Sequence, residues 1–132
     1  MQHLRTFIVE DSAIIRDSLV PALEEWGDVK VVGVAADESS ASKWLQAHGQ
    51  EVDLLIVDIY LRSGSGLGVL QAANALSMHA RRVVLTNYAT EPMRQKCRLA
   101  GADEVFDKST DLDALLAYCA RLRIDRGGSA AA

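Results

Sequence analysis

The chain has 132 residues, of which 49% are apolar, and its formal net charge is -4. This length suits one compact domain with a sizeable core and excludes two domains. The acidic balance argues against direct DNA binding, because proteins that bind a phosphate backbone present a basic surface. Neither a signal-peptide segment nor an apolar run of membrane length occurs, so we expect a cytoplasmic protein without membrane contact.

Five short apolar runs predict five strands, and each run is followed by a helical pattern. The run Leu54-Leu55-Ile56-Val57 lacks the alternation of a half-exposed strand, which is typical of a parallel strand buried on both faces. The expected strands cover residues 6–9, 29–34, 54–57, 82–86 and 104–108.

The helical patterns between these runs have recognisable ends. Ser12 and Thr110 are predicted to cap the first and last helices, and Thr90 opens the fourth. Pro21 lies inside the first pattern, where it should kink or shift the helix. Glycines are expected to end three of the helices at Gly27, Gly49 and Gly101.

The two cysteines, Cys97 and Cys119, are well separated, and neither has a second cysteine or a suitably spaced histidine beside it. This spacing fits neither a zinc site nor a disulfide framework. We therefore expect two buried thiols with a structural role.

Alternating strands and helices predict an α/β fold with a doubly wound, five-stranded parallel sheet. The flavodoxin-like (βα)5 arrangement with strand order 2-1-3-4-5 is the common solution at this size. We expect the domain to span residues 1–124. The segment 125–132, rich in glycine and alanine, is expected to be a disordered C-terminal tail.

Polar residues follow four of the expected strands: Glu10 and Asp11 the first, Asp58 the third, Thr86 the fourth and Lys108 near the end of the fifth. The strand order places the first strand beside the third, and the carboxyl ends of parallel strands meet at one edge of the sheet. The acidic residues should therefore face one another across a crevice, with the hydroxyl and the amine beside them.

Three gathered carboxylates repel one another by about 1 to 4 kcal/mol per close pair, so the site needs either a cation or a carboxyl group with a raised pKa. Carboxylate ligands with room for water suit Mg²⁺. A carboxylate beside such an ion can accept a phosphoryl group, while a lysine and a hydroxyl hold its oxygens. The pattern thus predicts Mg²⁺-dependent phosphoryl transfer to an aspartate.

The chain resembles the receiver domains of two-component response regulators over about residues 5–123. The residues that carry the resemblance are Glu10, Asp11, Asp58, Thr86 and Lys108. It implies that Asp58 accepts a phosphoryl group from a sensor histidine kinase or a phosphotransfer protein, and that Thr86 and Lys108 bind the phosphoryl oxygens.

The resemblance also implies the ligands of the metal. Asp11 and Asp58 would bind Mg²⁺ directly, Glu10 through water, and Tyr60 through its backbone carbonyl. A downstream protein target is expected, as is a homodimer through the fourth helix, fifth strand and fifth helix. Such a domain assists its own phosphorylation and dephosphorylation but is not a turnover enzyme.

Several positions depart from the family pattern. Val105 stands where the family carries its switch aromatic, with Phe106 next to it; Asn87 replaces a small residue, and Ser109 replaces a proline. These departures favour an alternative, a pseudo-receiver that acts as a phosphorylation-independent protein–protein adaptor, whereas the complete set of site residues argues against it.

A phosphohydrolase is disfavoured because Tyr60 stands where a second aspartate would be required, and the segment after the first strand is not a flavin phosphate loop. Tyr60 and Tyr88 each lie two residues after a site residue. We expect both rings at the rim of the crevice, where they either shield the site from water or serve a partner surface.

Overall fold

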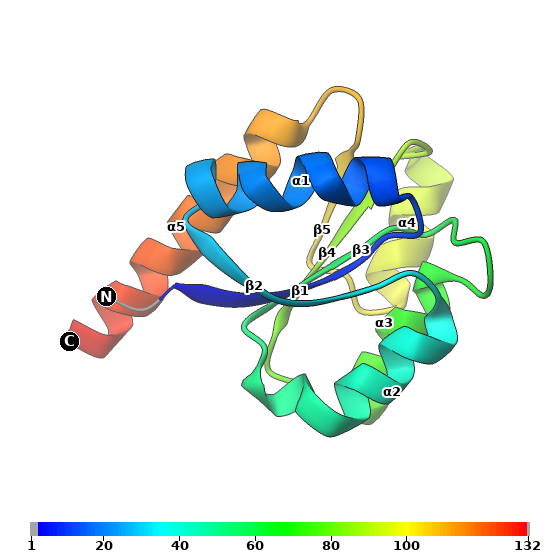
Figure 1. Ribbon diagram of the computed structural model, residues 1–132, viewed down its shortest axis with the longest axis horizontal. Coiled ribbons are helices and arrows are strands. Elements are labelled where there is room, and N and C mark those ends of the chain that lie inside the picture. Colours follow the sequence, from blue (N-terminus) through cyan, green and yellow to red (C-terminus); the bar gives the residue numbers. More distant parts are fainter. Residues whose placement is uncertain (1–2, 132) are drawn as a thin grey trace.

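The computed structural model describes the backbone of residues 3–131 and the side chains of residues 3–123. Within this part of the chain, five strands alternate with five α-helices (Figure 1). The strands are β1 (Leu4–Val9), β2 (Val29–Ala35), β3 (Leu54–Val57), β4 (Arg81–Thr86) and β5 (Glu104–Asp107). The helices are α1 (Ala13–Trp26), α2 (Glu38–His48), the short 3-10 helix η1 (Gly49–Glu51), α3 (Gly66–Ala75), α4 (Glu91–Leu99) and α5 (Leu112–Ala131).

All five strands are parallel and lie in the order β2-β1-β3-β4-β5, which confirms the predicted flavodoxin-like topology. Figure 1 shows α1 and α5 on one face of the sheet and α2 and α3 on the other. Every residue of β3 is buried. The central strand is therefore covered on both faces, as its unbroken apolar run predicted.

Successive residues of β1 face opposite layers of the core. Phe7 packs with the buried residues of α2, α3 and α4, whereas Ile8 packs with those of α1 and α5. Phe7 also stacks on Trp44 of α2, with ring centroids 4.0 Å apart. A side chain at Gly33 of β2 would lie 2.8 Å from the Trp44 indole. A glycine at this position leaves room for the ring to lie flat on the sheet.

Two of the three helix caps predicted from the sequence are present in the structure, and the third is shifted by one residue. Ser12 accepts a hydrogen bond from the Ile15 N–H at 3.3 Å, and Thr90 caps α4 in the same way. The last helix begins at Leu112, so Asp111 rather than Thr110 precedes it. The Asp111 carboxylate also accepts the Asp107 N–H at 2.9 Å, a link that fixes the end of β5 to the start of α5.

Three further features bear on the expectations from sequence. The α1 helix continues through Pro21 from Ala13 to Trp26. The α5 helix continues to Ala131 and so includes most of the segment expected to be a tail. Ala132, the last residue of that segment, lies outside the described residues. No helix of the described residues is long and apolar enough to cross a membrane.

The two cysteines are free and buried, as predicted, and they lie in different layers of the core. Burial raises the pKa of the Cys119 thiol to about 12 and also raises the pKa of Cys97. Both side chains therefore remain thiols at neutral pH, where they pack as small apolar groups.

Candidate functional site

A pocket of about 250 Å³ opens at the carboxyl ends of the strands. Its position follows from the strand order, because the crevice of a doubly wound sheet lies where the order reverses, here between β1 and β3. The residues that line it include Glu10, Asp11, Asp58, Tyr60, Tyr88 and Lys108.

Backbone hydrogen bonds continue the sheet past the strand ends and bring the site residues into line. The Asp58 N–H donates to the Val9 carbonyl at 2.9 Å, which places Asp58 beside the end of β1. The Lys108 N–H donates to the Thr86 carbonyl at 3.0 Å, which places Lys108 beside the end of β4. The predicted convergence of four strand ends is therefore present in the structure.

Three carboxylates meet in this pocket. Oxygen atoms of Glu10, Asp11 and Asp58 all lie within 4.8 Å of one another. Glu10 and Asp58 are buried, with 2% and 7% of their surfaces exposed, and Asp11 is half-buried. Carboxylate oxygens in this arrangement are the donors that a hard divalent cation takes, and an open side leaves room for water. The residues present therefore fit Mg²⁺.

Lys108 joins two of these carboxylates. Its ammonium group contacts Glu10 Oε1 and lies 2.9 Å from Asp58 Oδ2, with 10% of the lysine side chain exposed. Burial by itself lowers the pKa of Lys108, but the hydrogen bonds to Glu10 and Asp58 outweigh it, so the pKa is raised. Lys108 is therefore a fixed positive charge between two buried acids.

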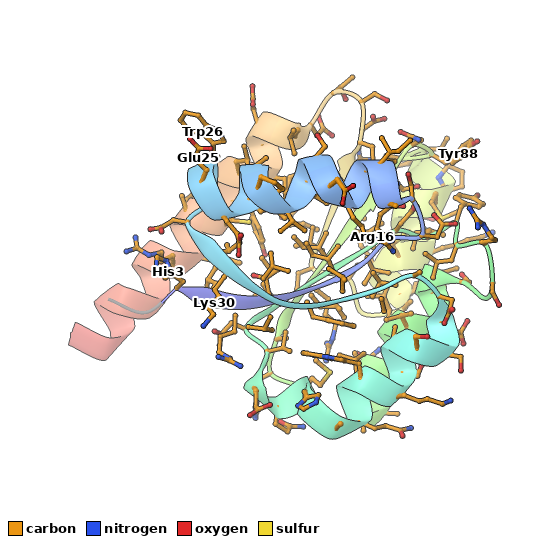
Figure 2. The ribbon with its side chains drawn as sticks, viewed as in Figure 1. His3, Arg16, Glu25, Trp26, Lys30 and Tyr88 are labelled. Carbon is orange, nitrogen blue, oxygen red and sulfur yellow. The ribbon has the colours of Figure 1, made fainter. Side chains whose placement is uncertain are left out.

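Glu10 is held from several directions. Its carboxylate accepts the Ser12 N–H at 3.1 Å, and its backbone carbonyl accepts a guanidinium N–H of Arg16 at 2.7 Å. Burial raises the pKa of Glu10, and the contact with Lys108 only partly offsets this. Figure 2 shows Arg16 near the start of α1, at the end of the molecule that also carries Tyr88.

Asp58 lies against the backbone of the following helix. The Asp58 carboxylate accepts the Tyr60 N–H at 3.3 Å. A Cβ atom at Gly66, the first residue of α3, would lie only 2.1 Å from the Asp58 carbonyl oxygen. The absence of a side chain at Gly66 therefore allows α3 to start directly against the backbone of Asp58.

Thr86 and its neighbours complete the far side of the site. Thr86 is fully buried, and its hydroxyl accepts the Tyr88 N–H at 3.2 Å; it does not line the pocket. Asn87 does line the pocket, and its side chain accepts a hydrogen bond from the Ser109 hydroxyl at 3.3 Å. Asn87 and Ser109, two of the three residues that depart from the family pattern, thus contact each other beside Lys108.

The rings of Tyr60 and Tyr88 meet at the rim of the pocket. Their centroids are 4.7 Å apart in an edge-to-face arrangement, and 51% and 58% of the two residues are exposed. The expectation of two rings at the rim is confirmed. Sequence reasoning did not assign Ser12, the N-cap of α1, or Ile15 within that helix to the pocket wall, because their patterns indicated only a cap and an apolar helix face.

Val105 and Phe106 take different positions on β5. Val105 is buried in the layer beneath α4, and its carbonyl accepts a guanidinium N–H of Arg94 at 2.8 Å. Phe106 packs in the opposite layer beside Tyr118 of α5. Neither the Val105 side chain nor the Phe106 ring lines the pocket.

A flavodoxin-like sheet with an acidic, lysine-bridged pocket at its switch point defines an α/β domain whose pocket carboxylates could hold a cation. Comparison with protein families is more specific. Residues 6–120 match the model of the response regulator receiver domain. The chain belongs to this family, whose domains serve two-component signalling.

Individual relatives agree with this assignment. The chain is 35% identical over 111 residues to protein-glutamate methylesterase/protein-glutamine glutaminase 5 of Myxococcus xanthus, covering 83% of this chain and 31% of that protein. It is 26% identical over 99 residues to response regulator UvrY of Escherichia coli O6:H1, covering 75% of this chain and 44% of that protein. The chain thus spans less than half the length of these relatives.

Solved structures show the same fold. The receiver domain of the response regulator NarL from Mycobacterium tuberculosis is similar with a TM-score of 0.79 at 22% identity, covering 92% of this chain and 98% of that one. The response regulator domain of Thermotoga maritima CheB gives a TM-score of 0.77 at 21% identity, covering 92% and 95%.

The close approach at Gly66 predicts a large difference between two glycines of α3. Gly66→Ala should lower the free energy of unfolding by about 1–3 kcal/mol, because the added methyl group meets backbone that cannot move away. Gly68→Ala is the comparison variant: its methyl group would meet the end of the Glu38 side chain, which can move aside at the cost of its hydrogen bond to Ser65. Its loss of stability should therefore be smaller, about 1 kcal/mol, and the better helix propensity of alanine offsets part of it. Urea unfolding followed by circular dichroism measures both. Equal stabilities would contradict this interpretation of Gly66.

Proposed function

We propose that this receiver domain is a phosphoacceptor: Asp58 takes a phosphoryl group in an Mg²⁺-dependent reaction, and the modified domain changes its binding to partners. The observation that carries this proposal is the contact of one ammonium group, from Lys108, with both Glu10 and Asp58 beside a third carboxylate, Asp11. Such a pocket has a nucleophile, ligands for a cation and a positive group for the transferred oxygens.

Asp11 and Asp58 would hold Mg²⁺, with Glu10 acting through water and Tyr60 through its backbone carbonyl. When bound, the ion supplies charge neutralisation that lets an anionic donor approach the acidic pocket. A carboxylate oxygen of Asp58 forms the new O–P bond while the bond between phosphorus and the donor's leaving group breaks. Lys108 would then bind a phosphoryl oxygen, and the hydroxyl of Thr86, the last residue of β4, would bind another.

A sensor histidine kinase or a phosphotransfer protein is the proposed source of the phosphoryl group, and a downstream protein is the proposed target. We propose that the chain acts by binding rather than as a turnover enzyme. A homodimer through α4, β5 and α5 is part of the same proposal. Family membership supports these assignments.

Asp58→Asn should abolish phosphorylation and leave the fold intact, because it removes the nucleophilic oxygen but keeps the size of the side chain. The parent, incubated with acetyl phosphate and Mg²⁺, should gain the mass of one phosphoryl group and lose it on treatment with hydroxylamine. Intact-protein mass spectrometry measures both. An unmodified parent would favour the phosphorylation-independent adaptor, and uptake by the variant at the parental rate would move the acceptor to another residue.

Asp11→Asn distinguishes the effect of this carboxylate on metal binding from its effect on the stability of the fold. In EDTA the variant should be as stable as the parent or more stable by up to about 1 kcal/mol, because one of three mutually repelling charges is gone. Adding Mg²⁺ should raise the Tm of the parent more than that of the variant, since a ligand that binds the native state stabilises it.

The matched control for this experiment is Asp17→Asn, which removes an exposed carboxylate from α1, the helix that follows Asp11. Its response to Mg²⁺ should equal that of the parent. Equal Mg²⁺-induced shifts in the parent and Asp11→Asn would remove Asp11 from the metal ligands.

The paired rings of Tyr60 and Tyr88 should slow hydrolysis of the phosphorylated aspartate. Hydrolysis needs a water molecule in line with phosphorus, opposite the Asp58 oxygen, and both rings line the pocket. Tyr60→Ala combined with Tyr88→Ala should lose phosphoryl label several-fold faster in Mg²⁺ buffer, without a matching loss of thermal stability.

Trp26→Ala is the control for that experiment, because Trp26 is an exposed aromatic residue at the opposite end of α1 from the pocket (Figure 2). Its decay rate should equal the parental rate. Unchanged or slower decay in the double tyrosine variant would favour the other interpretation, in which the two rings serve a partner surface.

A further inference from the structure

The loop between β3 and α3 is fastened to the start of α2 by one acidic residue. Glu38 is the first residue of α2. Its carboxylate accepts the Ser65 N–H at 2.9 Å, and its own N–H donates to the Ser63 carbonyl at 3.2 Å. Two hydrogen bonds of opposite direction therefore join this residue to the end of the loop, 27 positions further along the chain at Ser65.

Two glycines leave space for the Glu38 side chain. A Cβ atom at Gly64 would lie 2.4 Å from the Cβ of Glu38, and one at Gly68 would lie 2.4 Å from its carboxyl carbon. Gly64 also has a φ of +79°, which L side chains rarely adopt. The loop thus packs closely around the glutamate, so the carboxylate has a defined place rather than a solvent-exposed range of rotamers.

The anchored end of the loop is bonded directly to the end that leaves the site. Ser65 pairs with Tyr60 in an antiparallel bridge. The N–H of Gly66 donates to the Ile59 carbonyl at 3.0 Å, and the Ser65 hydroxyl caps α3 through the Leu67 N–H at 3.1 Å. Any displacement of Ser65 must therefore be followed by the backbone of Tyr60.

From this chain of contacts we infer that Glu38 is a positioning residue for the phosphoacceptor pocket. By holding Ser65, it fixes the backbone of Tyr60 and keeps the Tyr60 ring against Tyr88 over Asp58. Glu38 does not line the pocket and acts only through this loop. Its effect on the lifetime of the phosphoryl group rests on the proposed function, whereas its effect on the two rings does not.

Two substitutions isolate the hydrogen bond to Ser65. Glu38→Met keeps a long, unbranched side chain between the glycines but cannot accept from the Ser65 N–H. Glu38→Gln keeps a carbonyl oxygen that can accept it. Glu91→Met is the matched control. Glu91 is likewise the first residue of a helix, α4, but its exposed carboxylate makes a long surface ion pair, at 3.7 Å, with exposed Arg98.

The first readout is the contact between the Tyr60 and Tyr88 rings, measured by nuclear Overhauser effects in metal-free, unphosphorylated protein. We expect the contact in the parent, Glu38→Gln and Glu91→Met, and its loss in Glu38→Met. An intact ring contact in Glu38→Met overturns the inference. The inference is also overturned if Glu38→Gln or Glu91→Met loses the ring contact. Loss of the hydrogen bond to Ser65 would then not be the cause of the change.

The second readout is the decay of phosphoryl label on Asp58. Glu38→Met should decay up to about fivefold faster than the parent, the factor that corresponds to about 1 kcal/mol for one hydrogen bond. Glu38→Gln should decay at the parental rate. A purely structural role would lower the urea midpoint of Glu38→Met and leave its decay rate unchanged, which overturns the inference. Failure of the parent itself to take up label contradicts the proposed function, while the ring contact still decides the role of Glu38.

Discussion

The pocket depends on the contact of the Lys108 ammonium group with both Glu10 and Asp58. Removing Lys108 would leave two buried carboxylates without a compensating charge, and breaking a buried ion pair in this way typically costs about 3–5 kcal/mol. One ammonium group beside three carboxylates still leaves the pocket negative, and Asp11 lies at its more exposed side. This charge favours a cation, and in the proposed function it would keep a phosphate donor away until a cation is bound.

The fold supplies this arrangement through the ends of its strands. Parallel pairing sets Asp58 beside the end of β1 and Lys108 beside the end of β4. The sheet therefore fixes the backbone positions of both residues. The loop after β3 is less constrained by the sheet, and two contacts outside the pocket hold it. Gly66 lets α3 start against the backbone of Asp58, and Glu38 fixes the other end of the loop.

The features that are local in sequence could be predicted from it. The unbroken apolar run of β3 indicated burial on both faces, and the strand order followed from the alternation of strands and helices. The choice between Thr110 and Asp111 as the residue before α5 could not be made locally, because Asp111 is held by the N–H of Asp107 at the end of β5. Glu38 gave no signal at all, since its partner Ser65 is distant in sequence and its contacts form only in the folded chain.

The most direct test of this account is a crystal structure of the protein with Mg²⁺ and beryllofluoride, an analogue of a phosphoryl group. The account predicts beryllium bonded to a carboxylate oxygen of Asp58, Mg²⁺ bound by Asp11 and Asp58, and the Lys108 ammonium group moved from Glu10 to a fluorine atom. Beryllofluoride absent from Asp58 in a crystal with Mg²⁺ bound, or Lys108 still joined to Glu10 and Asp58 as in the free protein, would contradict it.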